Sequence, residues 1–549
     1  MRTLRWLALG VAVLVVACTT TPQAVQSGAP SATAPAATPA GTPDPRLTTL
    51  TIGVTQEPQS FDPHVNNAAV SAYRFYPNIY ESLIQYGTDG SLQPMLADSW
   101  TVSSDQLTLG FKLHPGVKFS DGTPFNAAAV KSSLDRMRAI KKGQVDLFAP
   151  ISTVNPVDDT TVDLVLSQPY APLLAILAGW QSAIFVSPTA IQTNAGTDNA
   201  QTWLSNHTAG TGPFTLESWD KNAKIVMVRN PNYRETPAAT AIQRVVYQFT
   251  TEQETLRQQL AAGDLDIVEE ISPALIAPLK ATNGVQVNVN VTRGASYGQV
   301  IFMNLKQKPF DDVNFRRALA YAIDYNRIVA LWNGVAVQSQ GPMPADFKPW
   351  FSAADAVQYH QDLAKAEASL KAGGFSFPLN PRMKMSLQWQ STQTIQRDMA
   401  SLIKEDLAKI GIDIDIQSVE IPVWRQAIWK HAFQLIFSQE PMRYADPDAF
   451  YSGDFISTEY RDGGFNPGVT DPHMDDLING GKSTTDQAKR LQYYNEVQKI
   501  VTDQELVLWL VNKQQAWAQG TNVANVVWNP AYGPHFRAND IKKTGLRSR

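Results

Sequence analysis

The sequence predicts an α/β fold, because strand-like and helix-like periodicities alternate along the chain. Residues 107–113 place Leu or Phe at every second position, which is the period of a half-buried strand. Asn126 can cap a helix whose apolar positions recur at helical spacing through residues 130–137. A second helical stripe, residues 395–411, ends in glycine, and residues 412–416 then alternate isoleucine with aspartate.

Length and composition indicate a protein of several domains without a strong charge bias. At roughly 150 residues per domain, the 549 residues suggest about three domains. The 46 Lys and Arg residues are balanced by 50 Asp and Glu residues, so no basic excess indicates a nucleic-acid partner. Cys18 is the one cysteine of the sequence, which excludes an intrachain disulfide and a cysteine-based metal cluster.

Residues 1–18 have the layout of a secretory signal. Two arginines precede an apolar run that is too short to span a bilayer comfortably. Val15-Val16-Ala17-Cys18 resembles a bacterial lipobox, which predicts acylation of Cys18. Lipid chains there would anchor the protein to the outer face of the bacterial cell membrane, in the periplasmic space if an outer membrane exists. Residues 19–46 are mostly Thr, Ala, Pro, Ser, Gly and Gln, and predict a disordered linker.

The folded body continues the α/β pattern. Residues 50–54 alternate as a strand, and Asp311 or Asp312 can cap a helix with an apolar face. The helical stripe of residues 363–370 is followed by two glycines, a favourable stop. Residues 507–510 are an apolar run typical of a buried strand.

Four short motifs between residues 80 and 122 follow one another in an order that resembles a known family. They are Tyr80-Glu81-Ser82-Leu83, Pro94-Met95-Leu96-Ala97-Asp98-Ser99-Trp100, Phe111-Lys112-Leu113 and Val117-Lys118-Phe119-Ser120-Asp121-Gly122. Gly210-Thr211-Gly212-Pro213-Phe214 and the block of residues 297–334 continue the series, and the likeness covers nearly all of residues 50–515. The chain resembles the extracytoplasmic solute-binding proteins of ABC importers, in the peptide/nickel-binding family (family 5, the oligopeptide/dipeptide-binding type).

The resemblance implies a periplasmic-binding-protein-like fold (type II, cluster C). We expect two α/β lobes around a ligand cleft, with an additional smaller domain. On this expectation the first lobe takes residues 47–84, 209–305 and 517–549, the small domain residues 85–208, and the second lobe residues 306–516. Residues 184–188 would form a strand leading back toward the first lobe.

No motif of the sequence predicts catalysis. The seven histidines show neither i, i+4 spacing nor an HExxH motif, and there is no GxSxG nucleophile elbow. Gly480-Gly481-Lys482-Ser483 resembles the end of a phosphate-binding loop, but Asp476 stands where that loop needs its first glycine. We therefore expect a binding protein with no catalytic residue, no cofactor and no metal site. A triad assembled from distant residues would leave no such motif.

The most informative stretch for a ligand is residues 433–451. In the family that the chain resembles, peptide-binding members carry an aspartate three residues before an Asp-Pro pair, where it meets the amino group of the peptide. Here Asp446-Pro447 is present, but Arg443 stands at that position, and Glu440 replaces the tryptophan typical just upstream. A guanidinium would repel an α-ammonium, which argues against ordinary peptide binding.

Two interpretations of Arg443 follow from the sequence. The side chain can face the cleft and hold a carboxylate, a phosphate or a sugar hydroxyl of the ligand. Alternatively, it can pair with Glu440, three residues before it, and staple the loop.

Four further residues are candidates for ligand contact by the same resemblance, and one of them is Glu440, at the position of the missing tryptophan. Tyr444 lies beside the ligand in the family. Trp389 ends a predicted strand where the family brings an aromatic side chain to the cleft, although it can equally be a core residue of the second lobe. Asn67 is a candidate on the opposite lip of the cleft.

The sequence thus predicts a lipid-anchored substrate-binding protein of an ABC importer. It would capture a peptide, a peptide derivative, a sugar or an opine-like acid and deliver it to the permease. We expect a monomer, with no nucleic-acid partner. A secreted hydrolase using the same cleft would differ by showing turnover. A ligand sensor subunit would differ by lacking neighbouring permease and ATPase genes.

Overall fold

The computed structural model of the protein describes residues 44–65, 69–179, 184–290, 298–440, 443–457, 466–527, 529 and 536–547. All structural statements below concern these residues. The predicted signal sequence with Cys18, the predicted linker up to residue 43, and Asn67 lie outside them.

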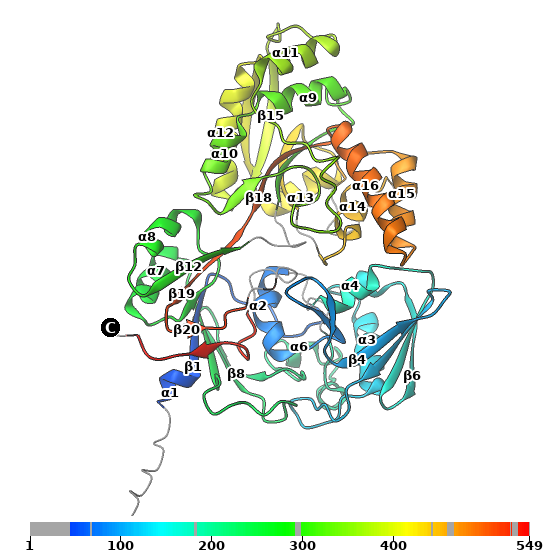
Figure 1. Cartoon of the computed structure of the whole chain (residues 1–549), viewed down its shortest axis with the longest axis vertical. Coiled ribbons are helices and arrows are strands. Elements are labelled where there is room, and N and C mark those ends of the chain that lie inside the picture. The colour runs from blue at the N-terminus through cyan, green and yellow to red at the C-terminus, as the bar shows by residue number, and fades with distance from the viewer. Residues whose placement is uncertain are drawn as a thin grey trace, which may run out of the picture. The chain divides into compact units, whose positions relative to one another are not determined.

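A mixed sheet of seven strands forms one lobe, which we call lobe I (Figure 1). In spatial order its strands are β12 (Val285–Asn290), β19 (Gln515–Gly520), β11 (Ile267–Val268), β1 (Thr49–Val54), β10 (Arg244–Phe249), β9 (Lys224–Arg229) and β8 (Phe214–Asp220). β1 is parallel to β10 and β11, and the other pairs are antiparallel. Strands from the start, the middle and the end of the chain therefore share one sheet.

A second mixed sheet, of six strands, forms lobe II. Its order is β14 (Ala336–Gln338), β18 (Val507–Lys513), β13 (Gly298–Met303), β17 (Leu435–Glu440), β15 (Met383–Gln390) and β16 (Ile412–Val419). Successive side chains of a strand point to opposite faces, so Ile301 and Met303 of β13 join one core while Val300 and Phe302 join another. Both faces of this sheet are buried, which explains why β13 is apolar at successive positions.

A sheet of four antiparallel strands forms the small domain: β4 (Ala97–Val102), β5 (Thr108–Leu113), β7 (Thr161–Leu166) and β6 (Ile151–Asp158). Helix α3 (Ala127–Ile140) packs against β6 and β7. Arg136 of α3 donates to both carboxylate oxygens of Asp62, at 2.9 and 2.6 Å, and this ion pair is buried. It joins the small domain to the loop that follows β1 in lobe I.

One direct passage between the lobes runs through β18 and β19 (Figure 1). Gln514 alone separates these strands, yet β18 belongs to the sheet of lobe II and β19 to that of lobe I. A connection of one residue leaves little slack, so relative motion of the lobes must be absorbed by the dihedral angles at this crossing.

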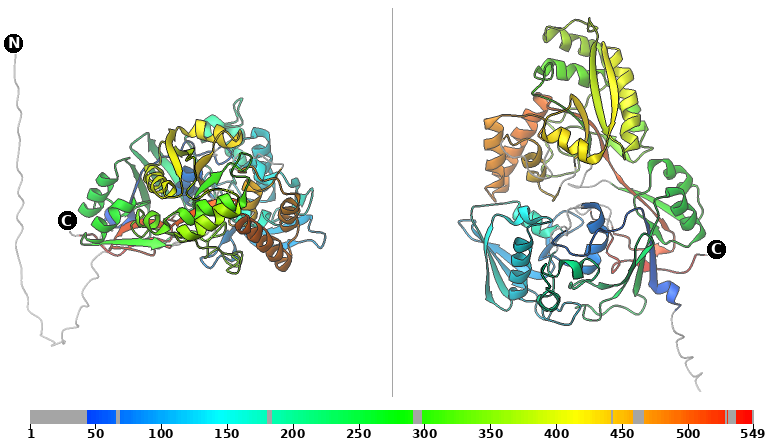
Figure 2. Two further views of the ribbon diagram at one scale, coloured as in Figure 1. Left: turned by 90° about the horizontal axis from the view of Figure 1, so that it is seen from above. Right: turned by 180° about the vertical axis from the view of Figure 1, so that it is seen from behind.

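Helices and short hairpins complete the described part. The helices are α1 (Pro45–Thr48), α2 (Ala69–Ile79), η1 (Val145–Phe148), α4 (Leu173–Ala178), α5 (Pro188–Thr193), α6 (Gln201–Leu204), α7 (Gln253–Ala262), η3 (Pro273–Leu275), α8 (Ile276–Lys280), α9 (Val313–Ala322), α10 (Tyr325–Ala330), α11 (Leu363–Ala372), α12 (Thr394–Ala408), α13 (Ile421–Trp429), α14 (Asp448–Asp454), α15 (Pro472–Lys482) and α16 (Gln487–Asp503). Two hairpins join β2 (Ile84–Tyr86) to β3 (Leu92–Pro94) and β20 (Val523–Ala524) to β21 (Lys542–Lys543). Helices α15 and α16 pack against each other in both views of Figure 2. Within the described residues, no helix has the length and apolar character needed to cross a bilayer.

The predicted α/β class and several predicted elements are confirmed. The side chain of Asn126 accepts a hydrogen bond from the backbone N–H of Ala129 at 3.1 Å and caps α3. Of the two aspartates considered, Asp312 caps α9, accepting from Asn314 and Phe315. The predicted strand of residues 107–113 is β5, the stripe of residues 363–370 is α11, and the alternating isoleucines are in β16.

Two expectations differ from the structure. Residues 184–187 are not part of any strand, so the predicted strand over residues 184–188 is wrong; Ser187 instead caps α5. The predicted domain boundaries stay a prediction, but sheet membership departs from them at β13. Residues 209–305 were expected in the first lobe, whereas β13 pairs with β17 and β18 in lobe II.

Candidate ligand-binding site

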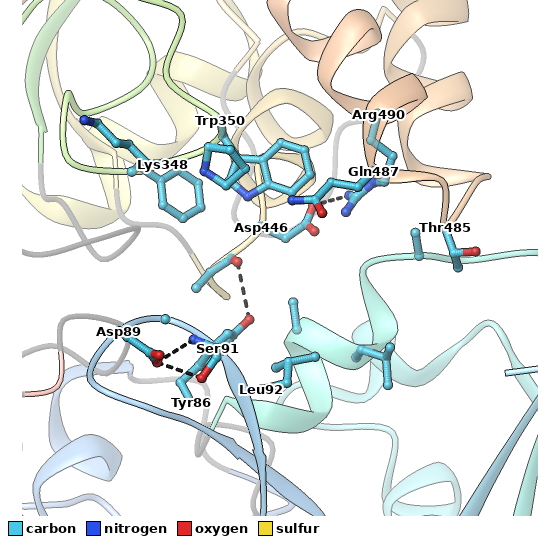
Figure 3. A pocket seen from close by; sticks show the side chains of 17 residues that line it. Tyr86, Asp89, Ser91, Leu92, Lys348, Trp350, Asp446, Thr485, Gln487 and Arg490 are labelled. Atoms are coloured by element: carbon cyan, nitrogen blue, oxygen red, sulfur yellow. Dashed lines mark hydrogen bonds and ion pairs between the residues drawn. The ribbon is translucent and has the colours of Figure 1, made fainter. Parts of the chain in front are cut away.

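A cleft of about 500 Å³ separates lobe II from helix α4 and the β2–β3 hairpin (Figure 3). On one side, the cleft is lined by the β2–β3 hairpin and by α4 with the loop before it. On the side of lobe II, it is lined by residues 347–350, by the segment after β17, and by α16 with the residues just before it. The lining residues are Tyr86, Asp89, Gly90, Ser91, Leu92, Ala171, Leu174, Ala175, Phe347, Lys348, Pro349, Trp350, Ala445, Asp446, Thr485, Gln487 and Arg490. A solute held here would contact both sides at once.

The wall of the cleft on lobe II combines an aromatic ring with an arginine whose charge is balanced by an aspartate. Arg490 donates to Asp446 at 2.6 Å and to the carbonyl of Gly481 at 2.8 Å, and its guanidinium lies 4.9 Å from the ring centre of Trp350 (Figure 3). Burial opposes the charge of Arg490, but the carboxylate of Asp446 raises the pKa of Arg490 above its usual value. Arg490 therefore stays charged and mostly compensated, while Lys348 supplies an exposed cation at the rim.

The opposite wall is apolar at α4 and polar at the tip of the β2–β3 hairpin. Asp89 accepts hydrogen bonds from the backbone N–H and the hydroxyl of Ser91, at 3.0 and 2.7 Å, which shapes the turn (Figure 3). Leu174 of α4 lines the cleft beside it. Tyr86 donates to the carbonyl of Ala445 at 3.3 Å, so one edge of the cleft is already bridged.

The structure gives Arg443 partners that neither sequence interpretation included. Its two terminal nitrogens donate to the two carboxylate oxygens of Asp146, at 2.8 and 3.1 Å, and one of them also donates to Gln144 at 2.7 Å. Asp146 and Gln144 belong to the small domain, 297 and 299 positions away in the sequence. The guanidinium of Arg443, which follows β17 of lobe II, thus binds the small domain.

The other predicted ligand residues lie in different surroundings. Tyr444 is buried against the core of the small domain, and burial raises the pKa of its phenol, which donates to Asp448 at 2.8 Å. Trp389 is only 9 % exposed and belongs to a core of lobe II, which favours the core alternative. Glu440 ends β17, and its side chain, like the whole of Asn67, is outside the described part.

Sequence reasoning missed most of the residues that line the cleft. Nothing in the sequence marks Arg490 as a cleft residue or brings Trp350 and Lys348 near Tyr86 and Asp89. Among the described residues, no three His, Cys, Asp or Glu side chains are grouped so that they could hold a metal ion.

Two lobes around a cleft, joined by strands that pass from one sheet to the other, define the class of two-lobed periplasmic binding proteins. The sequence model described as "Bacterial extracellular solute-binding proteins, family 5 Middle" matches residues 91–462, well over half of the chain. The chain belongs to this family of binding proteins.

Similar proteins of known name agree with this assignment. The chain is 30 % identical over 500 residues to the probable D,D-dipeptide-binding periplasmic protein DdpA of Escherichia coli K12, covering 90 % of the chain and 94 % of DdpA. It is 27 % identical over 463 residues to the glutathione-binding protein GsiB of Pectobacterium atrosepticum, covering 81 % of the chain and 85 % of GsiB.

Solved structures show the same fold. The binding protein AgaA from A. tumefaciens R10, in complex with agropinic acid, superimposes with a TM-score of 0.72 at 25 % identity, over 90 % of this chain and 98 % of AgaA. NikA from Brucella suis, in complex with Fe(III)-EDTA, superimposes with a TM-score of 0.79 at 22 % identity, over 90 % and 99 %. The expected fold class and family are confirmed.

Proposed function

We propose that the protein is the lipid-anchored substrate-binding subunit of an ABC importer. It captures a small polar solute between its lobes and delivers it to the permease. The observation that carries this proposal is a cleft of about 500 Å³ lined from both sides, in a chain of family 5. A solute that contacts both walls favours the closed arrangement by its differential contacts, and closure presents one composite surface to the permease.

The solute we propose is a peptide-like or opine-like acid. The relatives are described as binding a D,D-dipeptide, glutathione and agropinic acid, and all three ligands carry carboxylates. Lys348 places an exposed cation at the cleft, and Trp350 and Leu174 place apolar surface beside it. Arg443 is engaged with Asp146, which supports recognition of the solute by other groups.

The first test is to identify what the protein binds. Native mass spectrometry of the purified protein is expected to reveal a co-purified acid of defined mass. In a thermal-shift screen of peptides, sugars and opine-like acids, a true ligand at 100 times its Kd should add about 2.7 kcal/mol to the free energy of unfolding. If no compound raises the melting temperature and one of them is turned over, the protein is a hydrolase instead.

Two variants locate the solute in the cleft. Trp350→Ala and Lys348→Ala are each expected to weaken binding by about 1–2 kcal/mol, because they remove apolar contact and the rim cation. Lys404→Ala, an exposed lysine of α12 away from the cleft, is the matched control and should bind normally. Unchanged affinity in both cleft variants, measured by calorimetry, would place the solute elsewhere.

The proposed anchor has its own test. Metabolic labelling with a radioactive fatty acid should label the wild-type chain and fail to label Cys18→Ser, which should also leave the membrane fraction. Retention of Cys18→Ser in that fraction would contradict acylation at this residue.

A further inference from the structure

The small domain is attached to its two neighbours in different ways. Its contact with lobe I includes the Asp62–Arg136 ion pair, whose side chains are 0 % and 3 % exposed. Its contact with lobe II includes the Arg443–Asp146 ion pair, whose side chains are 24 % and 41 % exposed. A pair that keeps its access to water can open at little desolvation cost, whereas a buried pair cannot be broken without leaving a charge uncompensated.

Several contacts accompany Arg443 across this interface. The ring of Tyr444 packs against the core of the small domain. The backbone N–H of Ala171, before α4, donates to the carbonyl of Lys482 at 2.9 Å. The backbone N–H of Thr485 donates to Gln106 at 2.7 Å. Lobe II therefore rests on the small domain over several residues, with Arg443 as the charged part of the contact.

We propose that Arg443, Tyr444, Asp146 and Gln144 form a latch that holds lobe II against the small domain before any solute arrives. This inference rests on the proposed function, because it concerns the closing of the proposed solute cleft. The geometry supports it, since a guanidinium that donates to both oxygens of one carboxylate fixes orientation as well as distance. One of the two terminal nitrogens that donate to Asp146 also donates to Gln144.

The latch changes how the solute is captured. A binding protein whose closed form is partly populated without ligand shows a higher apparent affinity, because less of the binding free energy is used to close it. In the latched form, the guanidinium of Arg443 is bonded to Asp146 and Gln144. The solute then needs its own contacts with the cleft walls and gains no anchor from Arg443.

The experiment measures lobe closure directly, in the absence of solute. The chain carrying Cys18→Ser has no other cysteine, so two introduced cysteines can be labelled cleanly. Val157→Cys in the small domain and Val423→Cys in lobe II are suitable, since these valines are 55 % and 57 % exposed. Bound solute is removed by unfolding, dialysis and refolding, and the distance distribution between spin labels is recorded by pulsed electron resonance at low and high salt.

Arg443→Ala and Asp146→Asn are each expected to lower the ratio of closed to open molecules by about two- to fivefold at low salt. High salt should reduce that difference by screening the pair. The reversed pair, Arg443→Asp with Asp146→Arg, should recover the closed population. Arg382→Ala is the matched control, because Arg382 binds both oxygens of Asp413 within lobe II and should leave the distances unchanged.

Either of two results overturns the latch. One is an unchanged distance distribution in both single variants. The other is a shift in both that the reversed pair does not recover. Neither result bears on whether the protein binds a solute, because no solute is present in this measurement, whereas the proposed function fails on the thermal-shift and mass-spectrometric readouts.

Discussion

Glu505 is a carboxyl group placed where water hardly reaches it. Only 1 % of the residue is exposed, and one of its oxygens accepts a hydrogen bond from the phenol of Tyr359 at 2.5 Å. Burial raises the pKa of Glu505 to about 8, against the hydrogen bond from Tyr359 and the charges of Arg316 and Arg317, which lower it. The guanidinium of Arg316 donates to the backbone carbonyls of Phe310 and Glu505, so it does not form a direct ion pair with this carboxylate.

This shift makes the stability of the fold depend on pH. Between about pH 4.5 and 8 the folded protein keeps a proton on Glu505 that the unfolded chain has released. The free energy of unfolding should therefore fall as the pH rises through this window, by up to roughly 5 kcal/mol for this group. Glu505→Gln, which is neutral at every pH, should remove that part of the slope in urea unfolding. Glu405→Gln, an exposed control, should keep it, and equal slopes in wild type and Glu505→Gln would contradict the prediction.

Arg443 illustrates what the sequence can and cannot predict about a single residue. Its charge, at a position where the family resemblance implies an aspartate, predicted that the site departs from ordinary peptide binding. Its partner could not be predicted, because Asp146 is 297 positions away and only the packing of the small domain on lobe II brings them together. The same holds for Trp350 and Arg490, whose proximity depends on tertiary structure.

At the scale of elements, the loop of residues 210–214 is a packing device. A Cβ atom at Gly210 would lie 2.1 Å from the carbonyl oxygen of Ile79, and the N–H of Gly212 donates to that same oxygen at 2.8 Å. The loop therefore fits closely against the end of α2.

Gly210→Ala should destabilise the protein by about 2–3 kcal/mol, because the backbone of α2 has to move to admit the methyl group. Gly545→Ala is the control, since a Cβ there meets no atom within 4 Å. The change in urea midpoint at constant slope measures the effect. A cost below that of the control would show that α2 yields easily.

Elements with local signals were predictable, and those held by distant partners were not. The side-chain cap of α3 was predicted from Asn126, and that of α9 was predicted to be Asp311 or Asp312, of which the structure shows Asp312. The strand expected over residues 184–188 came from the family resemblance and was wrong, since a likeness in sequence order does not reveal which backbone lies beside a segment. In the structure the backbone of Val186 is satisfied by the side chain of Ser133, which takes the place of a neighbouring strand.

At the scale of the whole molecule, the sheet of lobe I needs both ends of the body. β19 lies between β12 and β11, and β1 lies beside β11. Removal of residues 514–549 would therefore expose the edges of two strands and the core beneath them. We expect that truncation to yield aggregated protein, whereas removal of residues 1–43 should leave a soluble, cooperatively unfolding body. Retention of a cooperative thermal transition in the C-terminal truncation would contradict this role of β19.

The position of β19 also determines when the sheet of lobe I can be completed during folding. The strand pairs with residues that leave the ribosome more than two hundred positions earlier, since Gln519 lies opposite Ile267. Until residues 515–520 are made, the sheet that contains β1 and β11 stays incomplete. Because this pairing is non-local, we expect the chain to commit to its native state late in folding.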